Sequence, residues 1–184
     1  PEQELLRVIR DRERAGSIRS TVNSLLSSAD ESKELLSTDT LRVITNLRDA
    51  LDDLDQNLAT GLTSAPEEEL NPLVTGLAAL AGLMQESMIR GTGWRFMELG
   101  KRIERALQTI ATLRALTKPV TDEADQSTLL TALLRSMEVL ITYRQRGRER
   151  HGLELGLELV MLDASNPRSL LFQLTTLQQH IAEL

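Results

Sequence analysis

Glu104 is the residue of this chain that is best placed to do chemistry. It belongs to a stretch, residues 93–106, that holds the only tryptophan and several charged side chains. A carboxylate at the edge of an apolar helix face can act as a general base that accepts a proton from an amine nucleophile. It can equally be the structural partner of a neighbouring arginine, which is the commoner arrangement. The sequence leaves both interpretations open.

The side chains around Glu104 have the spacing of an α-helix. Apolar residues recur at steps of three and four, which predicts one buried face made of Phe96, Leu99, Ile103, Ala106, Ile110 and Leu113. A second stripe should be a surface ladder worth a few tenths of a kcal/mol per pair, and consists of Arg95, Glu98, Arg102 and Arg105. Gly100 costs about 1 kcal/mol relative to alanine, which predicts another helix in close approach.

Two places favour contact with an anion or an acidic surface. The first is the glycine turn before this helix, whose backbone N–H groups would lie close to Arg90, Arg95, Lys101 and Arg102. The second is the basic stretch that begins with Tyr143 and Arg144 and ends at His151. Cations there also suit the carboxyl end of a helix. We therefore expect this stretch to contact an acidic face of a partner domain.

Composition excludes several other functions. The 184 residues include no cysteine, and His151 and His180 are the only histidines, so a metal site is not expected. The acidic runs at 49–55 and 67–69 are expected to be solvated helix faces. Nucleotide-binding and hydrolase glycine motifs are absent. A net charge of −6 gives no general attraction to nucleic acid, and no apolar run is long enough to span a membrane.

Helices must position all of these residues, because no segment alternates like a strand. Helical periodicity and capping signals predict helices over 17–29, 37–61, 64–90, 94–116, 123–146, 153–162 and from 166 to the end. Ser64 to Glu67 is typical of a capping box, and Asn166 with Pro167 is typical of a cap followed by a first-turn proline. The predicted fold is an all-α, up-and-down bundle of about six to seven helices.

A weak internal repeat links the two ends of the chain. Five residues recur with an offset of 152 positions, namely Leu5, Val8, Asp11, Ser17 and Leu25 as Leu157, Val160, Asp163, Ser169 and Leu177. This pattern favours a duplicated domain, in which the upstream counterpart of the Trp94 helix would lie outside this chain. The residues at the amino terminus are not typical of a natural start, so we expect a fragment of a longer protein.

Two motifs carry a resemblance to a known family. Residues 93–106 resemble the Trp-x-Phe-x-x-x-Gly-Arg-x-x-Glu-Arg-Ala signature of the bacterial alpha-E family, with Lys101 at the family's arginine position. Residues 163–170 resemble its second signature, Asp-x-x-Asn-Pro-x-Ser-Ile/Leu. The family has two related halves, which agrees with the repeat. In the first half Arg14 and Ala15 replace Asn-Pro.

The resemblance implies a function. Alpha-E modules are found beside or fused to circularly permuted ATP-grasp enzymes, which are inferred to be amidoligases. It implies an accessory helical domain that shapes or presents substrate, with ATP and Mg²⁺ held by the ATP-grasp partner, in cis or in trans, and no cofactor of its own. The expected binding residues are Trp94, Arg95, Lys101, Arg102, Arg105, Tyr143, Arg144, Asn166 and Ser169, and the tentative catalytic residue is Glu104.

The same resemblance also implies the boundaries of the domain and its location in the cell. Residues 1–184 would form one alpha-E-like domain, truncated on its amino-terminal side and located in the cytoplasm. Two alternatives remain open beside the accessory role. One is catalysis through Glu104 as a general base. The other is an oligomerisation or scaffold module, in which a second copy covers apolar surface in a homodimer.

Overall fold

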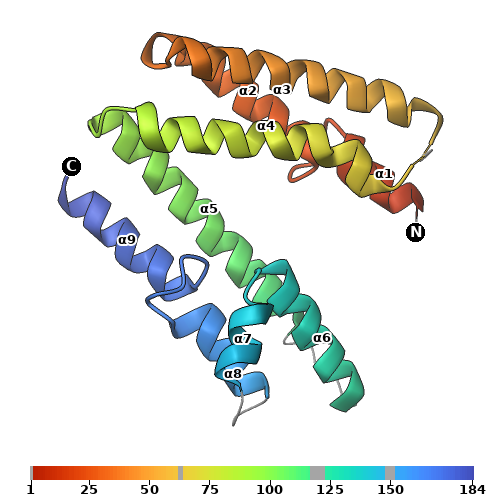
Figure 1. Cartoon of the computed structure of the whole chain (residues 1–184), viewed down its shortest axis with the longest axis vertical. Helices are drawn as coiled ribbons and strands as arrows, with labels where there is room; N and C mark the ends of the chain where they lie inside the picture. Colours follow the sequence, from red (N-terminus) through yellow and green to blue (C-terminus); the bar gives the residue numbers. More distant parts are fainter. Residues whose placement is uncertain (1, 62–63, 117–122, 148–151) are drawn as a thin grey trace. The chain divides into compact units, whose positions relative to one another are not determined.

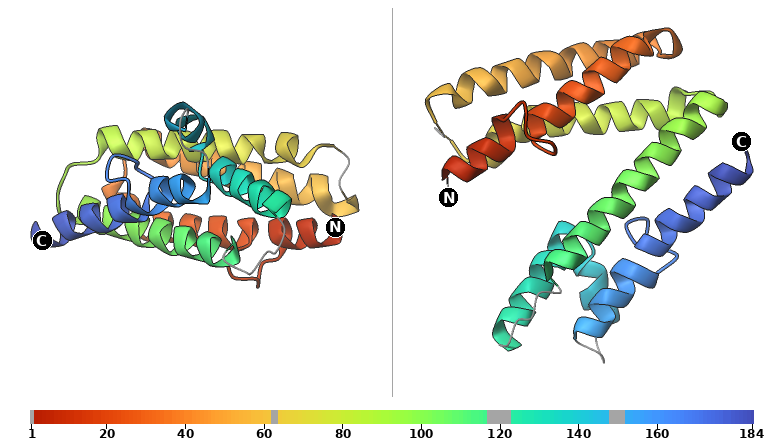
Figure 2. Two further views of the ribbon diagram at one scale, coloured as in Figure 1. Left: turned by 90° about the horizontal axis from the view of Figure 1, so that it is seen from below. Right: turned by 180° about the vertical axis from the view of Figure 1, so that it is seen from behind.

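A computed structural model describes residues 2–61, 64–116, 123–147 and 152–184. The chain divides into two compact units, an N-terminal unit (Pro1–Ile89) and a C-terminal unit (Arg90–Leu184). Within the described residues all regular structure is helical, as Figure 1 and Figure 2 show, so the all-α prediction is confirmed.

The N-terminal unit contains α1 (Glu2–Arg10), α2 (Ile18–Glu31), α3 (Thr38–Asn57) and α4 (Pro66–Ser87), with short 3₁₀ turns at Lys33–Leu35 and Leu58–Thr60. The C-terminal unit contains α5 (Thr92–Leu116), α6 (Glu123–Ser136), α7 (Leu140–Arg146), α8 (Leu153–Leu157) and α9 (Leu170–Ala182). A π-helical turn, η3 (Glu158–Leu162), continues α8. These nine α-helices in the described residues exceed the six to seven predicted.

A break within the predicted helix 123–146 accounts for one of the additional helices. Glu138 has a φ of 53°, in the left-handed region that a helix cannot contain. The chain leaves α6 there, where the N–H of Val139 donates back to the carbonyl of Leu134 at 2.9 Å and closes that helix. The carbonyl of Val139 then accepts the N–H of Tyr143 at 2.8 Å, which opens α7. No glycine or proline marks this position, so the sequence predicted one continuous helix where the structure has α6 and α7.

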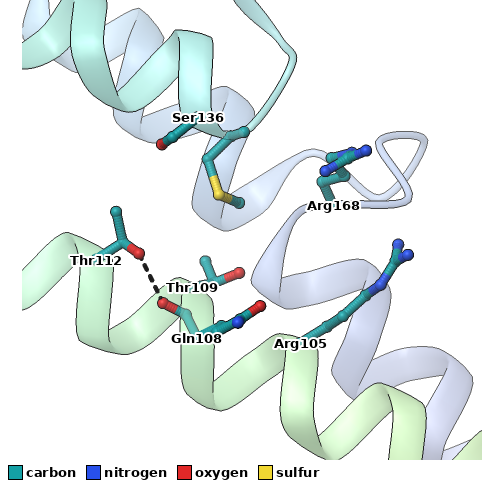
Figure 3. A pocket seen from close by; sticks show the side chains of 7 residues that line it. Arg105, Gln108, Thr109, Thr112, Ser136 and Arg168 are labelled. Atoms are coloured by element: carbon teal, nitrogen blue, oxygen red, sulfur yellow. Dashed lines mark hydrogen bonds between the residues drawn. The ribbon is translucent and has the colours of Figure 1, made fainter. Parts of the chain in front are cut away.

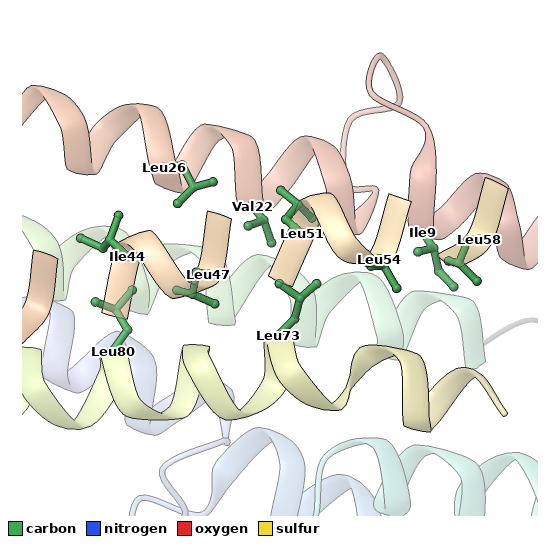
Figure 4. Packing of buried hydrophobic residues seen from close by; sticks show 10 residues of the cluster. All are labelled: Ile9, Val22, Leu26, Ile44, Leu47, Leu51, Leu54, Leu58, Leu73 and Leu80. Atoms are coloured by element: carbon green, nitrogen blue, oxygen red, sulfur yellow. The ribbon is translucent and has the colours of Figure 1, made fainter. Parts of the chain in front are cut away.

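Leucines of α3 form the centre of the N-terminal core. Leu47, Leu51, Leu54 and Leu58 are almost fully buried, and they lie between α1 and α2 on one side and α4 on the other (Figure 4). α4 approaches α3 closely at Gly76, where a Cβ atom would lie 2.6 Å from Cδ2 of Leu47. The close approach that Gly100 predicted therefore occurs at a different glycine.

The acidic run of α3 is less solvated than the sequence suggests. Arg19 of α2 is buried and donates to the carbonyl of Leu51 at 2.9 Å. Its guanidinium also lies 3.1 Å from a carboxylate oxygen of Asp52 and 3.3 Å from one of Asp55. These two aspartates link α2 to α3. Asp55 is half-buried, whereas Asp49, Asp52 and Asp53 are solvent-exposed as predicted.

The two halves of the internal repeat fold alike. In both, a short helix leads through a turn into a helix capped by serine, first as α1 and α2, then as α8 with η3 and α9. Ser17 donates its hydroxyl to the carbonyl of Asp11, and Ser169 donates to that of Asp163 at 2.6 Å. The same hydroxyls then accept the N–H groups of Ser20 at 3.0 Å and Phe172 at 3.1 Å.

Replacement of Asn-Pro in the first half leaves this turn intact. Ser17 donates its N–H to the carbonyl of Arg14 at 3.0 Å, as Ser169 does to that of Asn166 at 2.9 Å. What Asn166 adds is a bond from its side-chain amide to the carbonyl of Leu159, 2.8 Å away. The repeat thus preserves the backbone bonds and the serine, while the amide contact belongs to the second half.

Two predicted caps are wrong. Ala65, which has no capping side chain, precedes Pro66 at the start of α4, and Ser64 instead donates to a carboxylate oxygen of Glu69 at 2.5 Å. Asn166 does not cap the last helix, which begins at Leu170 with Ser169 as its cap. The predictions at Ser17 and Ser37 are confirmed. At Ser17, Ser37 and Ser169, the serine caps the helix because its hydroxyl accepts a backbone N–H of the first turn.

Candidate functional site

The side of α5 that packs within the C-terminal unit is its polar stripe. Glu98 is 2% exposed and Thr109 is 3% exposed, whereas Phe96 is 61% and Ile103 is 47% exposed. The predicted apolar face is therefore largely wrong: Ala106 and Leu113 are buried, but Phe96, Ile103 and Ile110 lie on the surface. The predicted surface ladder instead carries a buried glutamate, because its partners are close enough to neutralise it.

Glu98 is held by two cations on its own helix. Its carboxylate accepts hydrogen bonds from Lys101 and, at 2.8 Å, from Nη2 of Arg102. Such a buried charge is tolerated only when it is paired and hydrogen-bonded. Burial by itself would raise the pKa of Glu98, but the bonds and charges of Lys101 and Arg102 outweigh it and hold the pKa below its ordinary value. Glu98 is thus a fixed anion and a poor proton acceptor.

Arg102 extends this cluster from α5 to α9, which lie side by side in the C-terminal unit (Figure 1). Its Nη1 donates to Oε1 of the fully buried Gln173 at 3.3 Å, and Nε2 of Gln173 donates to the carbonyl of Pro167 at 2.5 Å. The guanidinium also lies 5.5 Å from the ring centroid of Phe172. These contacts fix both the helix pair and the turn that precedes α9.

A polar pocket lies one turn further along α5. It has a volume of about 380 Å³ and is lined by Arg105, Gln108, Thr109, Thr112, Ser136, Met137 and Arg168 (Figure 3). These residues come from α5, from the end of α6 and from the turn before α9. Small-molecule sites have volumes of this order. The lining includes no carboxylate and no histidine, so it offers binding groups and no general base.

The two arginines of the pocket differ in their partners. Nη2 of Arg168 donates to a carboxylate oxygen of Glu138 at 2.7 Å. Arg105 makes no hydrogen bond or ion pair with any residue that the structure describes. Partial burial, followed by the positive charges of Arg168 and Arg102, lowers the pKa of Arg105. Arginine still remains charged, so Arg105 brings to this pocket a cation that the charges of Glu98 and Glu138 offset only in part.

The hydroxyl groups on the pocket wall differ in whether they already donate a hydrogen bond. Thr112 donates to the carbonyl of Gln108 at 2.9 Å, and Ser136 donates to that of Leu133 at 2.8 Å. Their oxygens can therefore only accept a bond from a ligand. The hydroxyl of Thr109 has no hydrogen bond to the described residues, although the side chain is nearly buried. The Thr109 hydroxyl can therefore donate a hydrogen bond to a ligand in the pocket.

Glu104, the expected base, lies elsewhere on α5. It is solvent-exposed, does not line the pocket and forms no ion pair within the described ranges. The arginine-paired carboxylate that the sequence predicts is present at Glu98. A catalytic role of Glu104 stays a prediction, with no cavity beside it to support it.

The tryptophan end of α5 forms a separate cluster. Arg90 lies over the Trp94 ring at 4.4 Å, and His180 meets the same ring edge-on at 5.2 Å between centroids. Arg95 pairs with Glu183. The four cations expected to gather an anion at the glycine turn thus have other contacts, because Lys101 and Arg102 pair with Glu98.

The remaining predicted residues lie at the other end of the C-terminal unit. The hydroxyl of Tyr143 accepts the N–H of Gly152 at 2.9 Å, and Arg144 is exposed. Asn166 and Ser169 build the turn before α9, as described above. Residues 148–151, which include His151 and most of the basic stretch, lie outside the described residues.

Sequence reasoning missed Gln173, Thr109 and Arg168, and it assigned Glu98 to the surface. The sequence does hold a signal that Glu98 could be buried. Lys101 follows it by three positions and Arg102 by four, and cations at these spacings on a helix can neutralise a carboxylate whether it is exposed or buried. Gln173 follows Ser169 by four positions and so shares its buried side of α9. Nothing local predicts that Arg168 lines the same pocket as residues of α5, because that placement depends on the tertiary fold.

No three or more histidine, aspartate or glutamate side chains come together to hold a metal ion anywhere in the described residues. None of the helices there is both long and apolar enough to cross a membrane.

Fold and site together define a small all-helical domain with a buried ion cluster and a cationic pocket. The chain belongs to the Alpha-E family, whose model, described as a predicted alpha-helical domain with a conserved ER motif, matches residues 1–184. In the tryptophan stretch that motif corresponds to Glu104 and Arg105, and further Glu-Arg pairs stand at 13–14 and 149–150. Of Glu104 and Arg105, only Arg105 lines the pocket.

Related proteins are known from mycobacteria. Uncharacterized proteins of Mycobacterium tuberculosis and Mycobacterium bovis are each 35% identical to this chain over 180 residues, which is 95% of the chain. The chain spans about a fifth of the length of these relatives. No solved structure matches it.

Proposed function

We propose that this chain is an accessory binding domain of an ATP-grasp amidoligase system, and that it holds a substrate for a neighbouring catalytic domain. The observation that carries the proposal is the composition of the pocket. It combines two guanidinium groups with hydroxyl and amide groups and lacks any carboxylate or imidazole. Such a lining can bind and orient a polar molecule, but it supplies neither a base nor an acid to transform it.

The arrangement of carboxylates supports a non-catalytic role. Glu98 is fixed by Lys101 and Arg102, and its pKa is lowered, so it would accept a proton only in acid. Glu104 projects outside the pocket. Neither carboxylate is both basic and next to the pocket, which a general base would have to be.

The ligase partner enters the proposal through the family resemblance. The pocket has no carboxylate with which to hold Mg²⁺, so ATP and Mg²⁺ belong to the ATP-grasp domain in this scheme. Relatives about five times the length of this chain leave room for such a domain in the same polypeptide. An ATP-dependent reaction of this type also favours the cytoplasm as the location.

The test is ADP release by the parent-length protein, ATP-grasp portion included, with a pool of amines and carboxylates. We expect Arg105→Gln to raise the KM for the substrate while kcat is kept, and Glu104→Gln to change neither. Arg135→Gln, which removes an exposed cation from α6 outside the pocket, is the matched control. A loss of kcat in a normally melting Glu104→Gln protein would favour the general base instead.

One observation favours a second candidate, a scaffold that associates with its own copy. Phe96, Ile103, Leu107 and Ile110 expose apolar surface along one side of α5. A second copy could cover this stripe in a symmetric dimer. Sedimentation over a wide concentration range tests the idea, because a strict monomer would exclude it. Unchanged ADP release in both Arg105→Gln and Glu104→Gln would also favour the scaffold.

A further inference from the structure

We propose that the pocket between α5, α6 and the turn before α9 binds a small oxyanion, a carboxylate or a phosphate, through Arg105. The inference rests on the proposed role of this pocket as a binding site and specifies what it binds. Three features of the lining carry it. The Arg105 guanidinium has no ion pair with the described residues, the Arg168 guanidinium keeps N–H groups beyond its bond to Glu138, and the Thr109 hydroxyl donates no hydrogen bond to the described residues.

Arg105 is the group that most needs an anion. Its neighbours on the polar stripe are satisfied, because Arg95 pairs with Glu183 and Arg102 pairs with Glu98. Arg105 has no such partner within the described part of the chain. The nearby positive charges of Arg168 and Arg102 act unfavourably on it, and the carboxylates of Glu98 and Glu138 offset this effect only in part. An oxyanion in the pocket would relieve this repulsion and could accept two parallel N–H bonds from the guanidinium.

Arg168 faces the same space from the turn before α9. Figure 3 shows its guanidinium and that of Arg105 on the same side of the pocket. Glu138 occupies Nη2 of Arg168, which leaves the other guanidinium N–H groups for a ligand. Arg168 is held in place at its backbone as well, where its N–H donates to the side chain of Asn166 at 3.0 Å. The second cation is therefore pre-positioned.

Thr109 supplies the complementary hydrogen bond. Its side chain is 3% exposed, and its hydroxyl has no partner within the described residues. In Figure 3 its oxygen points toward the side on which the two arginines lie. A ligand oxygen at this position would accept the hydrogen bond that the Thr109 hydroxyl does not donate to any described residue. The amide of Gln108, on the same wall, is a second available donor.

Titration of the 184-residue chain with two probes tests the inference. Inorganic phosphate and N-acetylglycine are added separately in a buffer free of both groups, and backbone amide shifts of residues 105–112 and 168 are followed by NMR. We expect saturable shifts with at least one probe. The stronger probe identifies whether phosphate or carboxylate is the better ligand. No saturable shift with either probe, up to the solubility limit, would overturn the proposal.

Variants test whether Arg105 carries the binding. Arg105→Gln should weaken the better probe about tenfold or more, the usual loss when a charge-assisted bond is removed. Arg105→Lys should recover part of the loss, and Thr109→Val should weaken binding a few-fold. Arg135→Gln removes the same charge nearby and should leave affinity within about twofold. Equal losses in Arg105→Gln and Arg135→Gln would overturn the proposal, because net charge would then explain them.

The outcome is separable from that of the proposed function. Oxyanion binding that depends on Arg105, combined with unchanged ADP release in the Arg105→Gln parent protein, would support the site and refute its role in the ligase. A rise in KM without oxyanion binding would support the accessory role and refute the ligand class. Melting curves of each variant show that the comparison is made between folded proteins.

Discussion

Arg102 of α5 meets Gln173 of α9 with its Nη1 3.3 Å from Oε1, and the same guanidinium holds Glu98 at 2.8 Å. One half-buried arginine therefore links two helices across their interface. If these contacts stabilise the C-terminal unit, removal of the charge of Arg102 or of Glu98 should lower the free energy of unfolding. The turn before α9 should respond as well, because Gln173 also holds the carbonyl of Pro167.

Glu98→Gln should lower the free energy of unfolding by about 2–4 kcal/mol, because it leaves Lys101 and Arg102 without their anion in a mostly buried place. Glu104→Gln is the matched control on the exposed side of α5 and should change stability by no more than about 0.5 kcal/mol. Urea denaturation followed by Trp94 fluorescence measures both. Equal midpoints for the two variants would mean that the Glu98 cluster contributes nothing.

Acid should destabilise the protein mainly through two largely buried carboxylates whose pKa values are lowered in the folded state. The pKa of Glu4 is lowered as well, by its hydrogen bond to Arg14, but this pair is exposed and contributes little. Glu98 is lowered by its cations against the opposing effect of burial, and Asp163 mainly by the Ser165 hydroxyl. A lowered folded-state pKa stabilises the native state above the unfolded pKa, about 4.5 for Glu98. That contribution disappears as the pH falls through the folded-state pKa. Stability measured from pH 7 downward should therefore fall most steeply below about pH 4.5.

The Glu98→Gln protein should show a weaker dependence over the same range, since it lacks one of the two groups. Its stability curve should approach that of the natural chain at the acid end, where Glu98 is protonated in both. Parallel curves down to the lowest pH would contradict the assignment of Glu98 as a linked group.

Ser17→Ala and Ser169→Ala should each cost about 1–2 kcal/mol, because each removes a helix cap and a buried bond to an aspartate carbonyl. Ser24→Ala, on the exposed side of α2, removes only a bond to its own helix and should be close to neutral. Thermal unfolding compares the three. A large difference between Ser17→Ala and Ser169→Ala would show that the two turns of the repeat are energetically unequal.

Gly100→Ala should stabilise the chain by about 0.5–1 kcal/mol, since no other element lies within 4 Å of the added Cβ and helix propensity improves. Gly76→Ala is the informative contrast. Its Cβ would lie 2.6 Å from Cδ2 of the fully buried Leu47, which has little room to move, so we expect a loss of stability. Opposite shifts in melting temperature would confirm the pair.

Local signals in the sequence were enough for most of the fold. Serine caps at Ser17 and Ser37, leucine periodicity in α3 and the absence of alternating segments predicted helices that the structure contains. The repeat pointed to equivalent turns, and they are present. The break at Glu138 could not be predicted, because it is imposed by the packing of α6 and α7 on a residue that gives no local signal.

The site was harder to predict, since periodicity marks two candidate faces on α5 and does not say which one packs. Phe96 and Ile103 favoured the apolar face. Within the C-terminal unit the polar face of α5 is the one that packs, because Gln173 and the turn before α9 supply partners for Arg102. Arg105 was singled out from its motif, whereas Arg168 and Thr109 acquire meaning only when three distant segments meet around one cavity.

Glu138 combines a strained backbone with a counter-charge. A non-glycine residue at a φ of 53° costs about 1 kcal/mol or more, yet this position carries a glutamate whose carboxylate lies 2.7 Å from Arg168. Glu138→Gly would relax the backbone and at the same time leave Arg168 without its anion. The left-handed turn at the α6–α7 break thus places a carboxylate beside one of the two pocket arginines, where it lowers the positive potential of the pocket.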